Sequence, residues 1–177
     1  TVLSVYKLHM SKNGLTISLN EVLFYFTRAG FGVNASIGVS EDFARSNIWI
    51  AQNGFDPSEC SLLALDNLDS QTSSLSIQFE KTGDGSHLFC PEDKVLSAIE
   101  ASVSCVDWLE FNGLDGDLKL TNVDSPLLVV SALGANQCTG IQVSWTDKSN
   151  NHYEVNLKDD IEWEIISSSE APIELSN

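Results

Sequence analysis

The chain has 177 residues, 42% of them hydrophobic, and its 25 Asp and Glu outnumber nine Lys and Arg to give a net charge of −16. This length suits a single domain with a core of ordinary size. The negative field repels phosphate backbones and anionic membrane surfaces, so we expect neither nucleic acid nor a membrane as a partner. The acidity fits simple solubility, a basic protein partner or bound divalent cations.

The two ends of the chain are predicted to lie outside the core. Residues 1–16 are expected to be a leader or a flexible terminus, because His9-Met10 matches what a common cloning site leaves behind. Residues 167–177 show little apolar content and no sustained period, which predicts a flexible tail. A single α+β domain is expected between them, over residues 17–166. The sequence contains no secretory signal and no bilayer-spanning stretch, so we expect a soluble cytoplasmic protein.

A first helix is predicted from Ser18 through about Ala29. Ser18 and Glu21 have the spacing of a capping box, in which each side chain accepts a hydrogen bond from a free backbone N–H. Gly30 and Gly32 are expected to end the helix with backbone angles that other residues avoid. Helical spacing gives it one buried face, formed by Val22, Leu23, Phe26 and Ala29.

Two further helices are predicted in the amino-terminal third. One is expected to start at Ser40, with acidic residues in its first turn, and to stop at Asn53-Gly54. The other is expected to start at Asp56-Pro57, where Asp caps the helix and Pro takes the first helical position without losing a hydrogen bond.

The apolar period then changes from helical spacing to alternation. Residues 75–79 alternate between apolar and polar side chains, which predicts a half-buried strand. Residues 87–90 are expected to form a short returning strand. A helix is predicted over residues 92–109, where apolar side chains again recur at helical spacing.

The rest of the chain is predicted to be mostly strands, over residues 118–123, 141–146, 153–157 and 161–166, with a hairpin turn at 148–151 and a helix opening at Ser125-Pro126. Helices gathered first and strands gathered last favour an α+β fold. We expect the amino-terminal helices to pack with a mainly antiparallel sheet formed by the later part of the chain.

No familiar catalytic or cofactor motif is found in the sequence. Gly30-Phe31-Gly32 and Gly83-Asp84-Gly85 lack the third Gly or the Lys of nucleotide-binding loops. The four cysteines are too far apart for a zinc site and too few for a disulfide scaffold, so they are interpreted as buried free thiols. We expect no metal and no cofactor, and the pattern leaves open whether the chain is an enzyme.

Five scarce side chains are the candidates for a ligand site: Arg28, Arg45, Trp49, His87 and Cys90. The two arginines suit a carboxylate ligand, although the protein's own acids are competing partners. Trp49 fits a pocket, an interface or the core. His87 could activate the Cys90 thiol. Residues three apart on a strand face opposite sides, however, which favours a structural role for this pair.

Several short segments resemble the bacterial family known only as domain of unknown function 3726. They are Ile17-Ser18-Leu19-Asn20-Glu21, Ser40-Glu41-Asp42, Ile48-Trp49-Ile50-Ala51 with Gly54, Phe89-Cys90-Pro91 and Ser125-Pro126-Leu127-Leu128. The likeness spans residues 17–166, but residues 92–94 are charged where the family pattern has apolar and small residues. The resemblance implies a bacterial, cytoplasmic protein and transfers no catalytic residue.

Two functional hypotheses follow from these patterns. The first is an interaction or accessory domain that self-associates or binds another protein, because catalytic motifs are missing and strands are abundant. The alternative is a small-molecule enzyme or ligand-binding protein whose pocket draws on the five scarce side chains.

Overall fold

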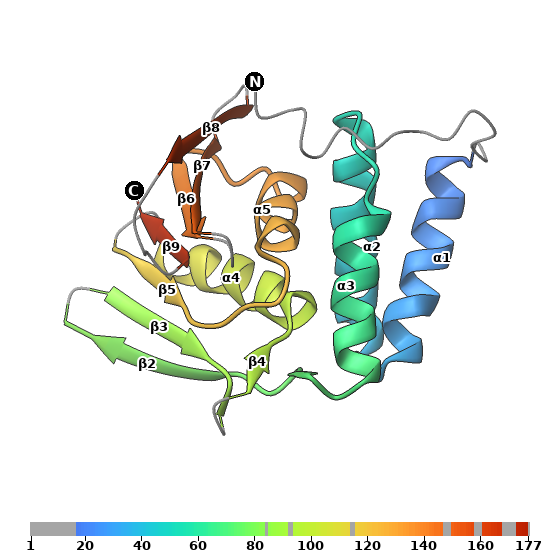
Figure 1. The fold of residues 1–177 in the computed structure, drawn as a ribbon, viewed down its shortest axis with the longest axis horizontal. Coiled ribbons are helices and arrows are strands. Elements are labelled where there is room, and N and C mark those ends of the chain that lie inside the picture. The colour runs from blue at the N-terminus through green and yellow to red at the C-terminus, as the bar shows by residue number, and fades with distance from the viewer. Residues whose placement is uncertain are drawn as a thin grey trace.

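The computed structural model describes residues 17–83, 85–91, 94–113, 116–146, 150–157, 161–167 and 173–176. The helices are α1 (Leu19–Gly32), α2 (Ile37–Gln52), α3 (Ser58–Asp69), α4 (Ala98–Asn112) and α5 (Pro126–Ala135). Figure 1 shows α4 and α5 next to the sheet, α2 and α3 beyond them, and α1 farthest from the sheet. The predicted α+β fold with early helices is confirmed, whereas the predicted leader in residues 1–16 lies outside the described residues.

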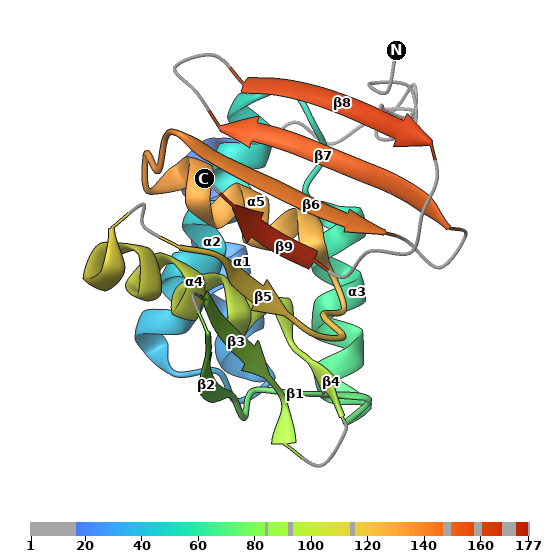
Figure 2. The same cartoon turned by 90° about the vertical axis from the view of Figure 1, so that its left-hand side faces the viewer.

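Seven strands form a mixed sheet. Their spatial order is β2 (Gln78–Thr82), β3 (Gly85–Phe89), β5 (Leu118–Leu120), β9 (Ile173–Ser176), β6 (Ile141–Thr146), β7 (Asn151–Leu157) and β8 (Ile161–Ser167). All neighbours are antiparallel except β3 and β5, which run parallel. Figure 2 shows the helices behind this sheet and its other face turned toward the viewer, uncovered by any helix. The mainly antiparallel character of the sheet was therefore predicted correctly.

The predicted flexible tail is wrong for residues 173–176. They form β9, which pairs with β5 on one side and β6 on the other. A strand in the middle of a sheet has both backbone edges hydrogen-bonded, so four residues suffice to hold it although the segment lacks a clear sequence period. The domain boundary expected at residue 166 is thus too early.

Helix α1 begins as the sequence predicts. The Ser18 side chain accepts from the Glu21 N–H at 3.2 Å, and the Ser18 N–H donates to the Glu21 carboxylate at 2.7 Å, which completes the capping box. Gly30 does not end the helix, however. It is buried inside α1, and a Cβ built there would lie 3.0 Å from the Ser40 Oγ on α2. The absence of a side chain at Gly30 therefore lets α1 and α2 approach closely.

Helix α2 begins one turn earlier than predicted. Ser36 is its cap and accepts from the Val39 N–H at 3.3 Å. Ser40, the predicted start, is fully buried inside the helix and donates to the Ser36 carbonyl at 2.8 Å. Helix α3 begins at Ser58, one residue later than predicted, because Pro57 holds the cap position and not the first helical one. The Asp56 carboxylate accepts from the Ser58 N–H at 2.8 Å.

The helix predicted over residues 92–109 is shorter at its start. Val95–Leu96 form strand β4, which pairs in parallel with β1 (Ser73–Ser74), and α4 begins only at Ala98. The Asp124 carboxylate accepts from the Ala98 N–H at 2.8 Å and so caps α4 from a residue far along the chain. Helix α5 opens at Pro126, as predicted from the Ser-Pro pair.

The strand predicted over residues 75–79 is displaced. Its apolar alternation falls between β1 and β2, and the β2 residue Phe79 is half exposed rather than buried. The returning strand β3 and the pair β6 and β7 were predicted correctly, and the predicted strand over residues 118–123 ends at Leu120. Part of the predicted turn at 148–151 lies outside the described residues.

The buried side chains form one cluster between the sheet and the helices. Leu118, Leu120, Val143 and Val155 come from the sheet, and α4 and α5 contribute residues such as Ile99 and Leu133. The stacked rings of Trp145 and Tyr153, 5.2 Å apart, extend this cluster along β6 and β7. Among the described residues, no helix combines the length and the apolarity needed to cross a bilayer.

Candidate functional site

Helix α1 carries apolar side chains on two opposite faces. Its inner face holds Val22 and Gly30, both buried, with Phe26 and Ala29 packed against the core cluster. The Phe26 ring meets the ring of Phe43 on α2 edge to face, with centroids 5.7 Å apart. This inner face accounts for the packing of α1, and within the described residues its outer face has no packing partner.

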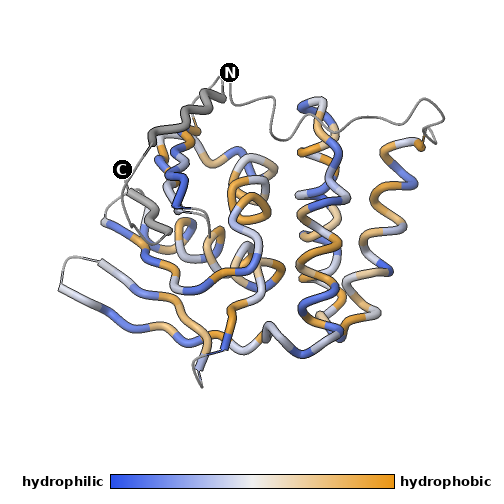
Figure 3. Tube along the Cα trace, in the orientation of Figure 1, coloured by the Kyte–Doolittle hydropathy of each residue, from blue (hydrophilic) through white to orange (hydrophobic). Residues whose placement is uncertain are grey.

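The outer face carries residues at alternating steps of four and three, the spacing of a helix-pairing seam. We call this set the outer stripe: Glu21, Phe24, Arg28 and Phe31 on the helix, with Ile17 one residue before the Ser18 cap. Phe24 is 53% exposed and Phe31 is 64% exposed. Such rings hold a large apolar area in water, and no other described element covers them. Figure 3 shows apolar stretches along α1 although it lies at the far end of the molecule from the sheet.

The charges of the outer stripe are fixed close to its rings. The Arg28 guanidinium lies over the Phe24 ring, 5.1 Å from its centroid, as in a cation–π contact. The hydrogen bonds from the Ser18 backbone and hydroxyl lower the pKa of Glu21 below its ordinary value, so this carboxylate is charged at neutral pH. The stripe therefore presents one fixed anion, one fixed cation and two aromatic rings.

A second candidate site is a small pocket between α2, α4 and α5, with a volume of about 170 Å³. Half of its polar lining residues are acidic: the set is Asp42 and Ser46 from α2, Ser102, Asp107 and Glu110 from α4, and Asn136, which caps the end of α5. The Ser46 hydroxyl already donates to the Asp42 carbonyl at 2.9 Å. The pocket holds no thiol or imidazole that could act as a nucleophile or base.

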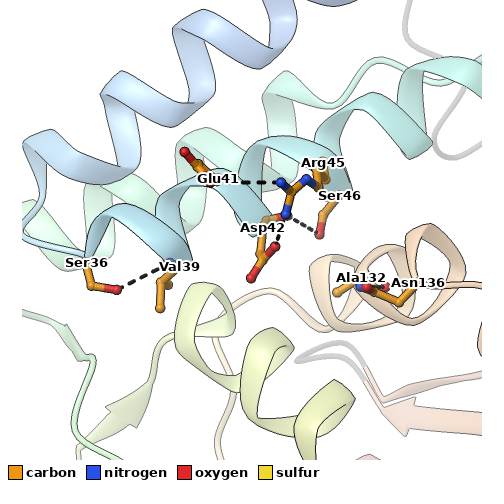
Figure 4. A network of polar contacts seen from close by, with 8 residues as sticks. All are labelled: Ser36, Val39, Glu41, Asp42, Arg45, Ser46, Ala132 and Asn136. Carbon is orange, nitrogen blue, oxygen red and sulfur yellow. Dashed lines mark hydrogen bonds and ion pairs between the residues drawn. The ribbon is translucent and has the colours of Figure 1, made fainter. Parts of the chain in front are cut away.

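On its α2 side, the negative charge of the pocket lining is paired with a cation. Arg45 donates to the Asp42 carboxylate at 2.6 Å and lies 3.9 Å from the Glu41 carboxylate (Figure 4). Glu100, which does not line the pocket, has its pKa raised by burial first and then by the charge of the pocket residue Asp107. Within the described parts of the chain, no group of three or more His, Cys, Asp and Glu has the arrangement of a metal site.

The structure places the five predicted site residues on three different elements and at one strand end. Arg28 is on the outer face of α1, and Arg45 makes the internal ion pairs that were weighed against a ligand. Trp49 packs against Gly134 of α5, where an added Cβ would lie 2.3 Å from the indole ring. These contacts give all three residues partners within the protein.

His87 and Cys90 each have other partners in the structure. The His87 ring is hydrogen-bonded to the Thr121 hydroxyl at 2.6 Å and lies against Phe89. Cys90 is buried beyond the end of β3, and its thiol donates to the Pro91 carbonyl at 3.3 Å. None of the five predicted residues lines the pocket between α2, α4 and α5, although Asp42, the partner of Arg45, does.

The sequence prediction missed both features. Phe24 and Phe31 were not recognised because a helix pattern is normally searched for one apolar face, and here the inner face explained the helix by itself. The signal was nevertheless present in the four-three spacing from Ile17 to Phe31. The pocket residues give no such signal, since three separate helices bring them together.

No protein-family model matches the chain, and no curated protein matches it either. The resemblance to domain of unknown function 3726 therefore stays a prediction.

Solved structures do show the same fold. A malate dehydrogenase from Pyrococcus horikoshii matches with a TM-score of 0.59 and 11% identity over 92% of this chain and 53% of its own. A malate dehydrogenase from Entamoeba histolytica matches with a TM-score of 0.52 and 8% identity over 89% of this chain and 50% of its own. An E. coli protein described as a malate/lactate dehydrogenase matches with a TM-score of 0.57 and 10% identity over 86% of this chain and 49% of its own. The chain thus spans about half the length of these proteins, and the likeness concerns the fold alone.

Proposed function

We propose that this chain is an interaction or accessory domain that self-associates through the outer stripe of α1. The observation that carries the proposal is the pair of half-exposed rings, Phe24 and Phe31, on a helix face that no described element covers. Aromatic residues and arginine are enriched at the energetic centres of protein interfaces. The outer stripe combines both types, with Arg28 already held against Phe24.

The test is the oligomeric state of the full chain, measured by light scattering after size exclusion. We expect a dimer at micromolar concentration. Replacing both rings, Phe24→Ser with Phe31→Ser, should weaken it by about 700-fold, since centrally placed rings each contribute ~2 kcal/mol to such interfaces. Phe111→Ser is the matched control, because Phe111 is 90% exposed on α4 and away from the stripe.

A wild-type chain that stays monomeric at high micromolar concentration would rule out self-association. A double variant that dimerises as well as the control would rule out the outer stripe as the interface. Circular dichroism of all three proteins has to show equal helix content, so that a loss of association is not a loss of folding.

The cellular setting belongs to the same proposal. The resemblance to a bacterial family and the four free cysteines both support a reducing cytoplasm, where thiols persist. Counting four titratable thiols in the unfolded chain from native cells tests this, and fewer than four would point to an oxidising compartment.

The enzyme alternative receives less support. The three dehydrogenases share the fold with only about 10% sequence identity. One fold can host many unrelated functions. The pocket of about 170 Å³ is smaller than the roughly 300 Å³ at which sites for organic ligands begin. A dehydrogenase assay with malate and nicotinamide cofactors tests this alternative directly, and we expect no activity from this chain.

A further inference from the structure

The residues of the outer stripe are arranged nearly symmetrically about Phe24. Phe31 lies seven positions after it, about two helical turns, whereas Ile17, seven positions before it, precedes the Ser18 cap and lies outside the helix. Glu21 lies three positions before Phe24, and Arg28 lies four positions after it. On the helix itself, the stripe thus has one ring at its centre and one at its carboxyl end, with a charge of opposite sign on each side of Phe24.

This arrangement is complementary to itself only when the second helix runs in the opposite direction. A two-fold axis beside Phe24 brings the two Phe24 rings together and directs each Phe31 toward the amino-terminal end of the partner's α1, which Ile17 precedes. Glu21 then lies about 1.5 Å along the axis from the point directly opposite the partner's Arg28, well within reach of that long side chain. A parallel pair would instead set Glu21 against Glu21 and Arg28 against Arg28, and such like-charge contacts disfavour an interface.

We infer that two copies of the chain associate by antiparallel packing of α1 on α1, with each Arg28 against the partner's Glu21. This inference rests on the proposed function and adds the partner, the helix direction and the register. The occupant is a second copy because the stripe supplies both members of each charge pair. The capping hydrogen bonds leave room for it, since both Ser18 groups use the same Glu21 oxygen, Oε2.

Charge exchange between two variants tests the register. Arg28→Glu alone sets Glu against the partner's Glu21, and Glu21→Lys alone sets Lys against the partner's Arg28. Each variant alone should therefore dimerise at least about tenfold more weakly than the wild type. An equimolar mixture should regain the dimer, because both contacts of the mixed pair then join opposite charges. Glu21→Gln is the control for the helix cap, since its amide oxygen can still accept from Ser18.

Cysteine cross-linking tests the direction of the helices. Each cysteine replaces an apolar side chain of the stripe and weakens the dimer, so cross-linking is carried out at a concentration at least about thirtyfold above the one at which the wild type dimerises. Under mild oxidation, Phe24→Cys should then link to itself across the two-fold axis. Phe31→Cys should not link to itself, but it should link to Ile17→Cys when the two variants are mixed. The wild-type chain is the control for its own four thiols, two of which are buried.

The outcomes separate the two claims. A monomeric wild-type chain overturns both the proposed function and this inference. The outer stripe would then bind a different protein. A wild-type dimer whose charge variants are not rescued by mixing, or one in which Phe31→Cys links to itself, overturns only the antiparallel register. Rescue on mixing together with the Phe31 to Ile17 link is the expected result.

Discussion

The contact between Trp49 and Gly134 shows how one missing side chain positions two helices. Trp49 lies on α2 and Gly134 on α5, and a Cβ at Gly134 would lie 2.3 Å from the indole carbons, closer than atoms can approach. Gly134 is therefore required by packing and not by its backbone angles. Its role explains why Trp49, a candidate for a ligand site, instead fills the space between α2 and α5.

Gly134→Ala should destabilise the fold, because α2 and α5 must move apart to admit a methyl group. We expect a loss of about 1 to 3 kcal/mol in the free energy of unfolding, measured with urea. Gly38→Ala is the matched control. Gly38 is exposed in α2 with no atom within 4 Å of a built Cβ, so alanine there should be neutral or stabilising by up to about 1 kcal/mol. Equal effects at the two sites would contradict this explanation.

The thiol of Cys60 should be chemically quiet at neutral pH. Burial raises its pKa to about 11, and the hydrogen bond with Ser61 offsets this only in part. Because the thiolate is the reactive form, alkylation of Cys60 in the folded chain should speed up roughly tenfold for each pH unit up to pH 10. Peptide mapping by mass spectrometry follows the site, with Cys60→Ser identifying its signal. A rate that levels off near the ordinary thiol pKa of about 8.5 would show that the site is open to water.

At the scale of elements, Asp124 joins the start of α4 to the segment before α5. Its carboxylate accepts from the Ala98 N–H at 2.8 Å. Asp124→Ala should therefore lower the free energy of unfolding by about 1 to 2 kcal/mol, as for other lost helix caps. Asp124→Asn should lower it much less, because the amide oxygen still accepts the hydrogen bond from Ala98. Urea unfolding at neutral pH distinguishes the two variants, and an equal loss in both would show that the charge and not the hydrogen bond matters.

Asp124 also predicts a dependence of stability on pH. Burial raises its pKa above the ordinary value of 3.8, despite the opposing hydrogen bond from Ala98. The folded chain thus keeps a proton that the unfolded chain releases. The resulting stability is fully present below pH 3.8 and is lost as the pH rises through the higher folded pKa. Asp124→Asn cannot titrate, so its stability relative to the native chain should increase over that interval and then level off.

Urea unfolding from just above the isoelectric point of 4.2 to about pH 8 measures this difference. Asp66→Asn, which removes an exposed carboxylate from α3, is the control. A difference between Asp124→Asn and the native chain that does not change with pH would contradict the prediction.

At the scale of the whole molecule, β9 holds two halves of the sheet together. It lies between β5 and β6, so β2, β3 and β5 contact β6, β7 and β8 in the sheet only through it. Removing residues 173–177 would leave β5 and β6 with unpaired backbone edges at the centre of the sheet.

We expect this truncated chain to unfold or aggregate under conditions in which the full chain is folded. Circular dichroism and size exclusion measure the outcome. A truncated chain with an unchanged melting temperature would show that β9 contributes little to the sheet.

Local sequence patterns predicted the elements whose signals lie within a few residues. The capping box of Ser18 and Glu21, the Asp56-Pro57 start and the Ser125-Pro126 start each depend on hydrogen bonds or dihedral limits inside one helical turn. The α+β class followed from the same local evidence, because the order of helical and alternating segments is visible in the chain.

Tertiary structure decided the features that depend on which surfaces meet. Ser40 resembled a helix start but is buried against α1, and residues 173–176 became a strand only because β5 and β6 offered free hydrogen-bonding edges. The pocket between three helices belongs to the same class. The spacing of apolar residues shows which side chains of a helix or strand share a face. Whether a neighbouring element covers that face depends on the rest of the chain. This is why the sequence contained the outer stripe of α1 and only the structure showed it exposed.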